Sequence, residues 1–356
     1  QGNIYKCFII NALYYLNEHG AYGLIHPEGL YDNPYGEELR KKLYRHLLYH
    51  FEFINEKDLF HDIAHTKRFS INIAAKDETD SFITITNLFD SKTIDDCFSD
   101  ENKYPLMGLK DDNNEWNIYG NPERIIKVDS DVLSVFGKVF DGKESMGARM
   151  PEVHAGVCVR LFEKMAKTET IIGGQRGFFC SQLMNETAAV KKGLIELNST
   201  FPFSMADEVY SGPNIWLANP FFKAARFPCI EKSDYDLTDL SIINNGRSLS
   251  RTKYKPTSKC YNELPQLESG IRYDEPYKIF ARRRLNLSME RTLISTIVPK
   301  NTIQIHAVLG IYVSDLRELV CIAACLNTVV YDFYIKTYGK EDLYDNTISK
   351  LPIPIT

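Results

Sequence analysis

Apolar residues follow two different spacings along the first hundred residues of the chain. Helical spacing predicts one helix over residues 4–18 and a second, amphipathic helix from Glu37 to about Tyr49. The apolar face of the second helix is formed by Leu39, Leu43, Leu47 and Leu48. Short apolar or alternating runs predict strands, of which the first is expected to be buried, at 21–25, 51–55, 69–74 and 82–87. This order of helices and strands predicts an α/β layer fold.

The pattern changes after about residue 76. Residues 76–144 hold sixteen acidic and eight basic residues, and they predict an acidic, partly helical connector with helices at 132–140 and 153–167. Beyond residue 195 the periodicity weakens and Gly, Pro, Ser and aromatic residues become more frequent, which favours an irregular, strand-containing domain. A long helix is predicted at 316–338. The predicted domains are therefore 1–100, 101–200 and 201–356.

Composition narrows the class of protein. The chain has 356 residues, a net charge of −5 and no apolar run of the roughly 18 residues that a membrane-spanning helix needs. Its eight cysteines are scattered and form no CxxC pair, which disfavours zinc knuckles and suits a reducing cytoplasm. We therefore expect a cytoplasmic protein without a membrane partner. Because residue 1 is Gln and not Met, we also expect the chain to be part of a longer protein.

One segment reverses the charge of the chain. Residues 247–300 hold twelve Lys or Arg against five Asp or Glu, a local net charge of +7. The cations alternate with Tyr, Ser and Thr, a mixture that binds phosphates and reads base edges. The alternative interpretation is a solvated charged face. We name residues 247–300 the basic segment.

The candidate DNA-binding residues all lie in the basic segment. They are Arg247, Arg251, Lys253, Tyr254, Lys255, Lys278, Arg282, Arg283, Arg284, Arg291 and Lys300. Strand alternation would place Arg282 and Arg284 on one face and Arg283 on the other, so at least one of the three is expected to be structural. Arg291 follows Glu290 beside an apolar strand, a setting that also suits an internal ion pair. Tyr254 and Tyr273 could pack against sugar or base, or be buried.

Motifs for catalysis or metal binding are absent from the sequence. His61 and His65 have the spacing of a zincin helix, but the intervening acid is Asp62 and no third ligand is suitably spaced. No P-loop or GxSxG elbow occurs, and no nuclease-type carboxylate cluster. Residues 32–35, Asp-Asn-Pro-Tyr, are interpreted as a turn before the next helix. We therefore expect neither a metal site nor a catalytic residue.

The order of these segments resembles the C-terminal half of a large bacterial N6-adenine DNA methyltransferase with a TaqI-like target-recognition domain. Residues 4–29 resemble the helix and strand that follow the catalytic motif, and Leu59-Phe60 with residues 69–73 resemble the segment beside the flipped base. The segments similar to recognition-domain signatures are 210–216, 251–254, 290–294, 326–327, 332–334 and 351–354.

The resemblance implies the end of a Rossmann-like methyltransferase sheet followed by a mixed α+β recognition domain. It implies S-adenosylmethionine as cofactor of the complete enzyme and Phe60 as the residue that stacks on the flipped base. Double-stranded DNA, the upstream methyltransferase half and restriction or defence subunits would be the partners. The Gly-rich donor loop and the Asn/Asp-Pro-Pro-Tyr motif are missing, so this chain alone is expected to bind no cofactor and to methylate nothing.

Two other functions remain open at this point. In the first, the chain is a protein-interaction module whose basic segment docks an acidic partner or residues 76–144, without DNA. In the second, the aromatic residues bind single-stranded nucleic acid. The salt dependence of duplex binding distinguishes them, because phosphate contacts release counterions.

Overall fold

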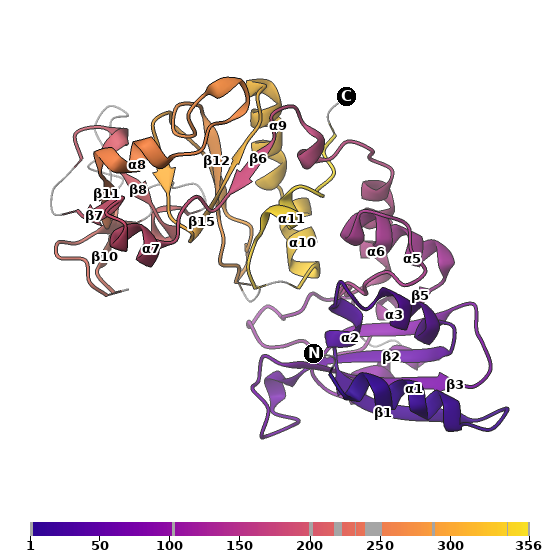
Figure 1. Cartoon of the computed structure of the whole chain (residues 1–356). Coiled ribbons are helices and arrows are strands. Elements are labelled where there is room, and N and C mark those ends of the chain that lie inside the picture. The colour runs from indigo at the N-terminus through magenta and orange to yellow at the C-terminus, as the bar shows by residue number, and fades with distance from the viewer. Residues whose placement is uncertain are drawn as a thin grey trace. The chain divides into compact units, whose positions relative to one another are not determined.

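The chain folds into two compact units, Gln1–Glu169 and Thr170–Thr356, each described here by itself (Figure 1). The structure is a computed structural model. It describes residues 3–101, 104–198, 202–216, 223–231, 233–238, 251–286, 289–339 and 341–354. Both units mix helices with sheets, so the chain has the expected α/β plus α+β character. The boundary differs from the expected three-part division, because residues 101–169 belong to the first unit.

A five-stranded sheet with the order β1-β3-β2-β4-β5 organises the first unit. Strands β1, β2 and β4 run in the same direction, and β3 and β5 are antiparallel to their neighbours. The carboxyl ends of β1, β2 and β4 therefore share one edge of the sheet, which we name the carboxyl edge. The strands are β1 (Ala21–Pro27), β2 (Leu47–Ile54), β3 (Arg68–Ala75), β4 (Phe82–Leu88) and β5 (Ile126–Val128). The helices are α1 (Tyr5–Tyr15), α2 (Gly29–Asp32), α3 (Glu37–Tyr44), α4 (Lys92–Phe98), α5 (Ser130–Phe136) and α6 (Gly156–Ala166).

The two faces of this sheet are both largely buried, but they differ in chemistry. One carries an apolar core with Phe51, Phe53, Ile85 and Leu88, against which Cys97 of α4 packs. The alternate positions of the same strands are polar and at most 2% exposed: His50, Glu52, Ser70, Asn72, Thr84 and Thr86. These groups are satisfied by one another and by the covering segments, as buried polar groups must be.

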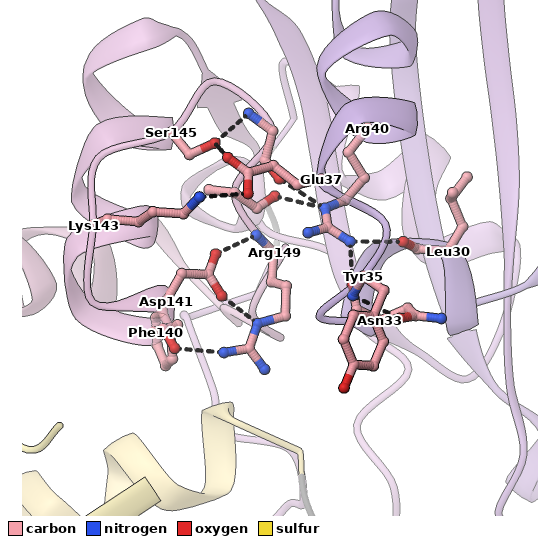
Figure 2. A network of polar contacts seen from close by, with 12 residues as sticks. Leu30, Asn33, Tyr35, Glu37, Arg40, Phe140, Asp141, Lys143, Ser145 and Arg149 are labelled. Atoms are coloured by element: carbon pink, nitrogen blue, oxygen red, sulfur yellow. Dashed lines mark hydrogen bonds and ion pairs between the residues drawn. The ribbon is translucent and has the colours of Figure 1, made fainter. Parts of the chain in front are cut away.

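Arginine side chains attach the residues after β5 to this unit (Figure 2). Arg40 is 1% exposed and donates hydrogen bonds to the carbonyls of Leu30 (3.1 Å), Asn33 (2.6 Å) and Gly147 (2.9 Å). Glu37 accepts hydrogen bonds from Lys143 (2.6 Å) and Ser145 (2.7 Å). These bonds join α3 to the loop after the π-helix Gly137–Asp141. The acidic stretch therefore completes the first unit and is not a separate connector.

Three element predictions are wrong in detail. The helix predicted from Glu37 to Tyr49 ends at Tyr44, because Leu47 already pairs with Ala74 of β3. Strand β1 is an edge strand of the described sheet with alternating exposure, so the expected burial of 21–25 is not found. The helix predicted at 316–338 is two helices, α9 (Leu316–Leu326) and α10 (Val329–Thr337), bent by 66°. The bend follows from Thr328, whose hydroxyl caps α10.

Two four-stranded sheets form the core of the second unit. The first has the order β13-β12-β15-β6 and is antiparallel, and the second has the order β14-β8-β11-β7. A short antiparallel pair, β9 with β10, adds to them. The strands are β6 (Phe179–Ser181), β7 (Ile195–Leu197), β8 (Val209–Tyr210), β9 (Lys223–Ala225), β10 (Tyr235–Leu237), β11 (Tyr254–Pro256), β12 (Lys278–Arg282), β13 (Ser295–Val298), β14 (Ile303–Gln304) and β15 (Val308–Tyr312). The remaining helices are α7 (Glu186–Lys191), α8 (Ser258–Glu263) and α11 (Asp345–Ile348).

No single helix in the described ranges is long and apolar enough to span a membrane. Only α9 and α10 together, as a bent pair, have the required length and composition. One side of this pair is enclosed by the second unit, with Ile322, Leu326 and Ile335 at most 1% exposed, whereas Val320 and Val329 are 50% and 69% exposed.

Candidate nucleic-acid interface

Strand β12 carries two cations of the basic segment, Lys278 and Arg282. Strand alternation turns Lys278 to the same side as Phe280, and both are fully buried. The Lys278 ammonium donates to the carbonyls of Asp274 (3.2 Å) and Pro276 (3.1 Å) and lies 4.9 Å from the Tyr273 ring. Burial lowers the pKa of Lys278 to about 7. Lys278 and the buried Tyr273 are therefore part of the core, and we withdraw Lys278 as a DNA contact.

Arg282, Arg283 and Arg284 are adjacent in sequence but have three different environments. Arg283 pairs with Asp342 (3.3 Å) and lies over the Tyr344 ring, so it is the structural member that strand alternation requires. Arg284 is exposed and pairs with Glu341 (3.3 Å). The guanidinium of Arg282 lies 4.9 Å from the centre of the Trp216 ring. Within the described parts of the chain, Arg282 has no ion pair.

The cations at and beside β11 are bound by acids or by a carbonyl of the second unit. Lys253 (3.2 Å) and the Tyr254 hydroxyl (2.6 Å) bind the same oxygen of Glu186. Lys255 pairs with Glu196 at 3.2 Å on the surface. Arg251 donates to the carbonyl of Ala225. Tyr254 is buried, which agrees with the second of the two roles considered for it.

Arg291 forms the internal ion pair that its sequence setting allows. Its Nε lies 3.4 Å from Asp332 of α10, and a terminal nitrogen donates to the carbonyl of Asn327 (3.1 Å). The same carboxylate accepts the backbone N–H groups of Thr292 (2.8 Å) and Leu293 (2.7 Å). Arg291 and Asp332 therefore hold the residues just before β13 against α10, so this arginine has a structural role.

Lys300, the last residue of the basic segment, contacts an aromatic ring. Its ammonium lies 5.5 Å from the Tyr277 ring, and no acidic partner for it is found among the residues described. Arg247 lies outside the described residues. Of the candidate cations that the structure describes, Arg282 and Lys300 are thus the two without an ion pair or a hydrogen-bond acceptor.

Phe60 lies in the first unit, on the loop that follows β2 and the short 3-10 helix Asn55–Lys57, at the carboxyl edge. It is 38% exposed and packs edge-on against Phe69, with ring centres 4.8 Å apart. Phe69 is the register partner of Pro27 at the end of β1. Phe60 therefore lies on the side of the sheet where α/β folds bind ligands. Its role in stacking on a base remains a prediction.

A buried amide fixes the loop around Phe60. The Asn55 side chain is fully buried, accepts the N–H of Phe60 (2.9 Å) and donates to the carbonyls of Phe60 (2.9 Å) and Ile63 (2.8 Å). The loop consequently presents Leu59, Phe60 and Ile63 to solvent on a defined backbone. No signal in the sequence distinguishes Asn55 from an ordinary turn asparagine.

A second cluster at the carboxyl edge was missed by the sequence analysis. Arg68 pairs with the buried Glu52 and with Glu152 (2.7 Å), and His50 contacts Glu28 (3.2 Å). Burial raises the pKa of Glu152 to about 8, against the opposing effect of Arg68. The alternating polar residues of β2 and β3 were the available signal, but such alternation ordinarily marks a solvent-facing side of a strand.

The histidine and cysteine positions give no metal site. His61 contacts Asp58 (2.9 Å) and His65 contacts Glu56 (3.1 Å), and both histidines are exposed. No group of three or more His, Cys, Asp or Glu suited to a metal ion occurs in the described ranges. All eight cysteines are free.

The chain was compared with family models, curated proteins and solved structures. No family model and no curated protein matches the chain. Among solved structures, the chain is similar to the type IIG restriction endonuclease BpuSI, with a TM-score of 0.33 and 10% sequence identity. The match covers 100% of this chain and 42% of that protein. This is a weak similarity to a restriction enzyme, so the proposals below are argued from the residues of this chain.

Proposed function

We propose that this chain recognises double-stranded DNA as the target-recognition part of an N6-adenine DNA methyltransferase of restriction–modification or phage defence. The proposal rests on which cations of the basic segment have partners within the protein and which do not. Most of its described cations are held by acids or carbonyls, whereas Arg282 and Lys300 each lie over an aromatic ring with their donors unused. Cations supported by aromatic rings suit the phosphates and base edges of nucleic acid.

The first unit supports the methyltransferase part of the proposal. Three parallel strands end at the carboxyl edge, where ligands of α/β folds bind, and the exposed Phe60 lies there on a loop fixed by Asn55. An enzyme that modifies a base in duplex DNA must turn the base out of the helix and hold it. We propose that Phe60 stacks on that base and that the sheet is the last part of a Rossmann-like methyltransferase domain.

The upstream methyltransferase half is the partner that we propose for the first unit. Helix α1 exposes Phe8 (64%), Tyr14 (77%) and Tyr15 (82%), and Ile4 just before it is 74% exposed, although the helix packs against β1. Strand β1 pairs on one side only within the described sheet. A row of exposed apolar side chains beside an open strand edge suits strand addition by another polypeptide. Restriction or defence subunits are further proposed partners of the complete enzyme.

S-adenosylmethionine is the proposed cofactor of the complete enzyme, to which it would supply the methyl group. The polar side chains at the carboxyl edge bind one another, as in Arg68 with Glu52 and Glu152. They leave no evident position for the adenosine or the sulfonium among the described residues, so we derive no step of methyl transfer. Calorimetry with the cofactor is expected to give no heat of binding for this chain alone. Micromolar affinity would contradict its proposed place in the enzyme.

Selection from a random duplex library tests the proposed function. The immobilised chain, at about 50 mM salt where phosphate contacts are strong, is expected to enrich a common motif. The enriched duplex should compete better than either of its single strands. Retention of no DNA would favour the protein-interaction alternative, and preference for single strands would favour stacking on unpaired bases. Either of these results would contradict duplex recognition.

A further inference from the structure

We propose that Arg282 reads one guanine of the target sequence, with Trp216 holding the plane of its guanidinium. The inference rests on the proposed function and adds the residue and the base that determine sequence preference. It is carried by the difference between Arg282 and the other cations of the basic segment.

The backbone around Arg282 is fixed by the sheet. Arg282 is the last residue of β12, its N–H donates to the carbonyl of Ile294 (2.9 Å), and it pairs in register with Val308 of β15. Alternation turns its side chain to the same face as Phe280, which is fully buried. The side chain therefore leaves a rigid strand end in a defined direction.

Trp216 fixes the side chain itself. The indole packs against the apolar cluster that contains Phe280, Tyr210 and Ile215, and the Arg282 guanidinium lies over it at 4.9 Å. Stacking on an aromatic face uses the flat side of the guanidinium and leaves all five N–H donors at its edge available. In such a stacked arrangement, the plane of the fork is held before any partner binds.

The donors of Arg282 have no acceptor in the described chain. Each of its nitrogen atoms is at least partly accessible to solvent, because none of them is a fully buried atom that lacks a hydrogen-bond partner. Burial of the side chain lowers the pKa of Arg282, because no nearby carboxylate compensates the loss of hydration. Arg283 and Arg291, by contrast, each have a carboxylate within 3.4 Å. A partner that offers two coplanar acceptors would satisfy Arg282 where the protein does not.

The planar guanidinium of Arg282 suits a guanine better than it suits a phosphate. Its O6 and N7 are two acceptors in one plane at the major-groove edge, and arginine binds them with both arms. A phosphate would accept the charge in many orientations and would need no fixed plane. Lys300 is a point charge over Tyr277, the kind of cation that suits a phosphate. The two unpaired cations therefore have different assigned roles.

Base substitution with matched variants tests the inference. Each guanine of the selected duplex is replaced in turn by 7-deazaguanine, which lacks the N7 acceptor, and binding to wild-type and Arg282→Lys protein is compared. We expect one position at which the wild-type protein loses affinity by about twofold to tenfold, because one of the two acceptors of a bidentate contact is removed. Arg282→Lys keeps the charge, so it should retain its affinity for unrelated duplexes. It lacks the planar fork of arginine, so it should lose this discrimination.

Two controls separate base reading from general attraction. Arg284→Lys changes an exposed arginine of the same triplet that already pairs with Glu341, and it should discriminate like the wild-type protein. Lys300→Ala should weaken binding to all duplexes by a similar factor. Unchanged affinity of Arg282→Lys for unrelated duplexes also shows that the variant is folded.

Three outcomes would overturn the inference. They are discrimination retained in Arg282→Lys, a uniform loss of affinity for all duplexes in that variant, and the absence of a sensitive guanine in the wild-type protein. All three presuppose that the wild-type protein binds duplex DNA. A wild-type protein that binds none would instead overturn the proposed function, so the two failures are distinguishable.

Discussion

Two arginines of the molecule have opposite roles: Arg40 in α3 of the first unit and Arg282 at the end of β12 in the second unit. Arg40 is buried and surrounded by carbonyl oxygens that it joins across distant parts of the first unit (Figure 2). Arg282 lies on an indole ring with no acceptor in the described chain. The first side chain is used by the fold, and the second is left for a partner. The number of acceptors around a guanidinium, and not the local charge, decides between these roles.

The same contrast divides the basic segment. Lys278, Arg283 and Arg291 hold strands and helices of the second unit together, although the sequence offers them as DNA contacts on equal terms with Arg282. A local charge of +7 therefore overstates the charge available to DNA. Exposure and pairing of each cation have to be known before a charged segment is assigned to nucleic acid.

The largest expected effect concerns stability. Arg40→Met would leave several buried carbonyls without a donor, and we expect it to lower the free energy of unfolding by on the order of 3–5 kcal/mol. Arg282→Met removes no hydrogen bond within the described chain and should cost less than about 1 kcal/mol. Urea unfolding of both variants measures the difference. Equal losses would show that the two arginines do not differ as described.

A smaller, pH-dependent effect is expected at Lys278. Its pKa in the folded protein is about 7, below the value of 10.5 for a free side chain, because burial disfavours the ammonium. Between these two values the unfolded chain holds the extra proton, so the contribution of Lys278 to stability rises with pH by up to about 1.4 kcal/mol per unit. Below pH 7 this rise is absent.

Thermal unfolding at several pH values checks this prediction. Between pH 7 and pH 9.5 the melting temperature of the wild-type protein should rise relative to that of Lys278→Met. A parallel pH profile for the two proteins would mean that the Lys278 ammonium is as well solvated in the folded protein as in the unfolded chain.

The smallest expected effect on stability concerns Phe60. Because its ring is 38% exposed, Phe60→Ala should cost no more than about 1.5 kcal/mol, whereas Phe53→Ala, at a site 2% exposed in the same aromatic cluster, should cost about 3–5 kcal/mol. In the complete enzyme, Phe60→Ala should reduce the 2-aminopurine signal of base flipping. An unchanged signal would contradict the stacking role, whatever the stability result.

How much could be predicted from the sequence depended on the kind of pattern. Strands β3 and β4 were predicted within one residue at each end because period-two alternation is local. The end of α3 was missed, since the leucines at 47 and 48 fit a helical face as well as a strand. Burial of β1 was misjudged because an edge strand differs from a central one only through its neighbours. The bend at Thr328 depends on a single capping hydroxyl.

The candidate site was less predictable than the fold. The location of the cations in one segment was evident, but their partners, such as Asp332 for Arg291 and Asp342 for Arg283, lie about forty to sixty residues away in the chain. Trp216 is similarly distant from Arg282, so nothing local marks that arginine as unpaired. The role of Asn55 also depends on a loop geometry that the sequence does not specify.

The salt dependence of duplex binding tests the central claim most directly, because it counts the cations that reach phosphates. Each phosphate contact contributes about −0.9 to the slope of log K against log salt concentration. With most of the basic segment held by the fold, we predict a slope between about −2 and −4, from Lys300 and the few surface cations that can exchange partners. A slope of about −8 or steeper would mean that the internally paired cations bind DNA after all. No measurable binding at about 50 mM salt would contradict duplex recognition altogether.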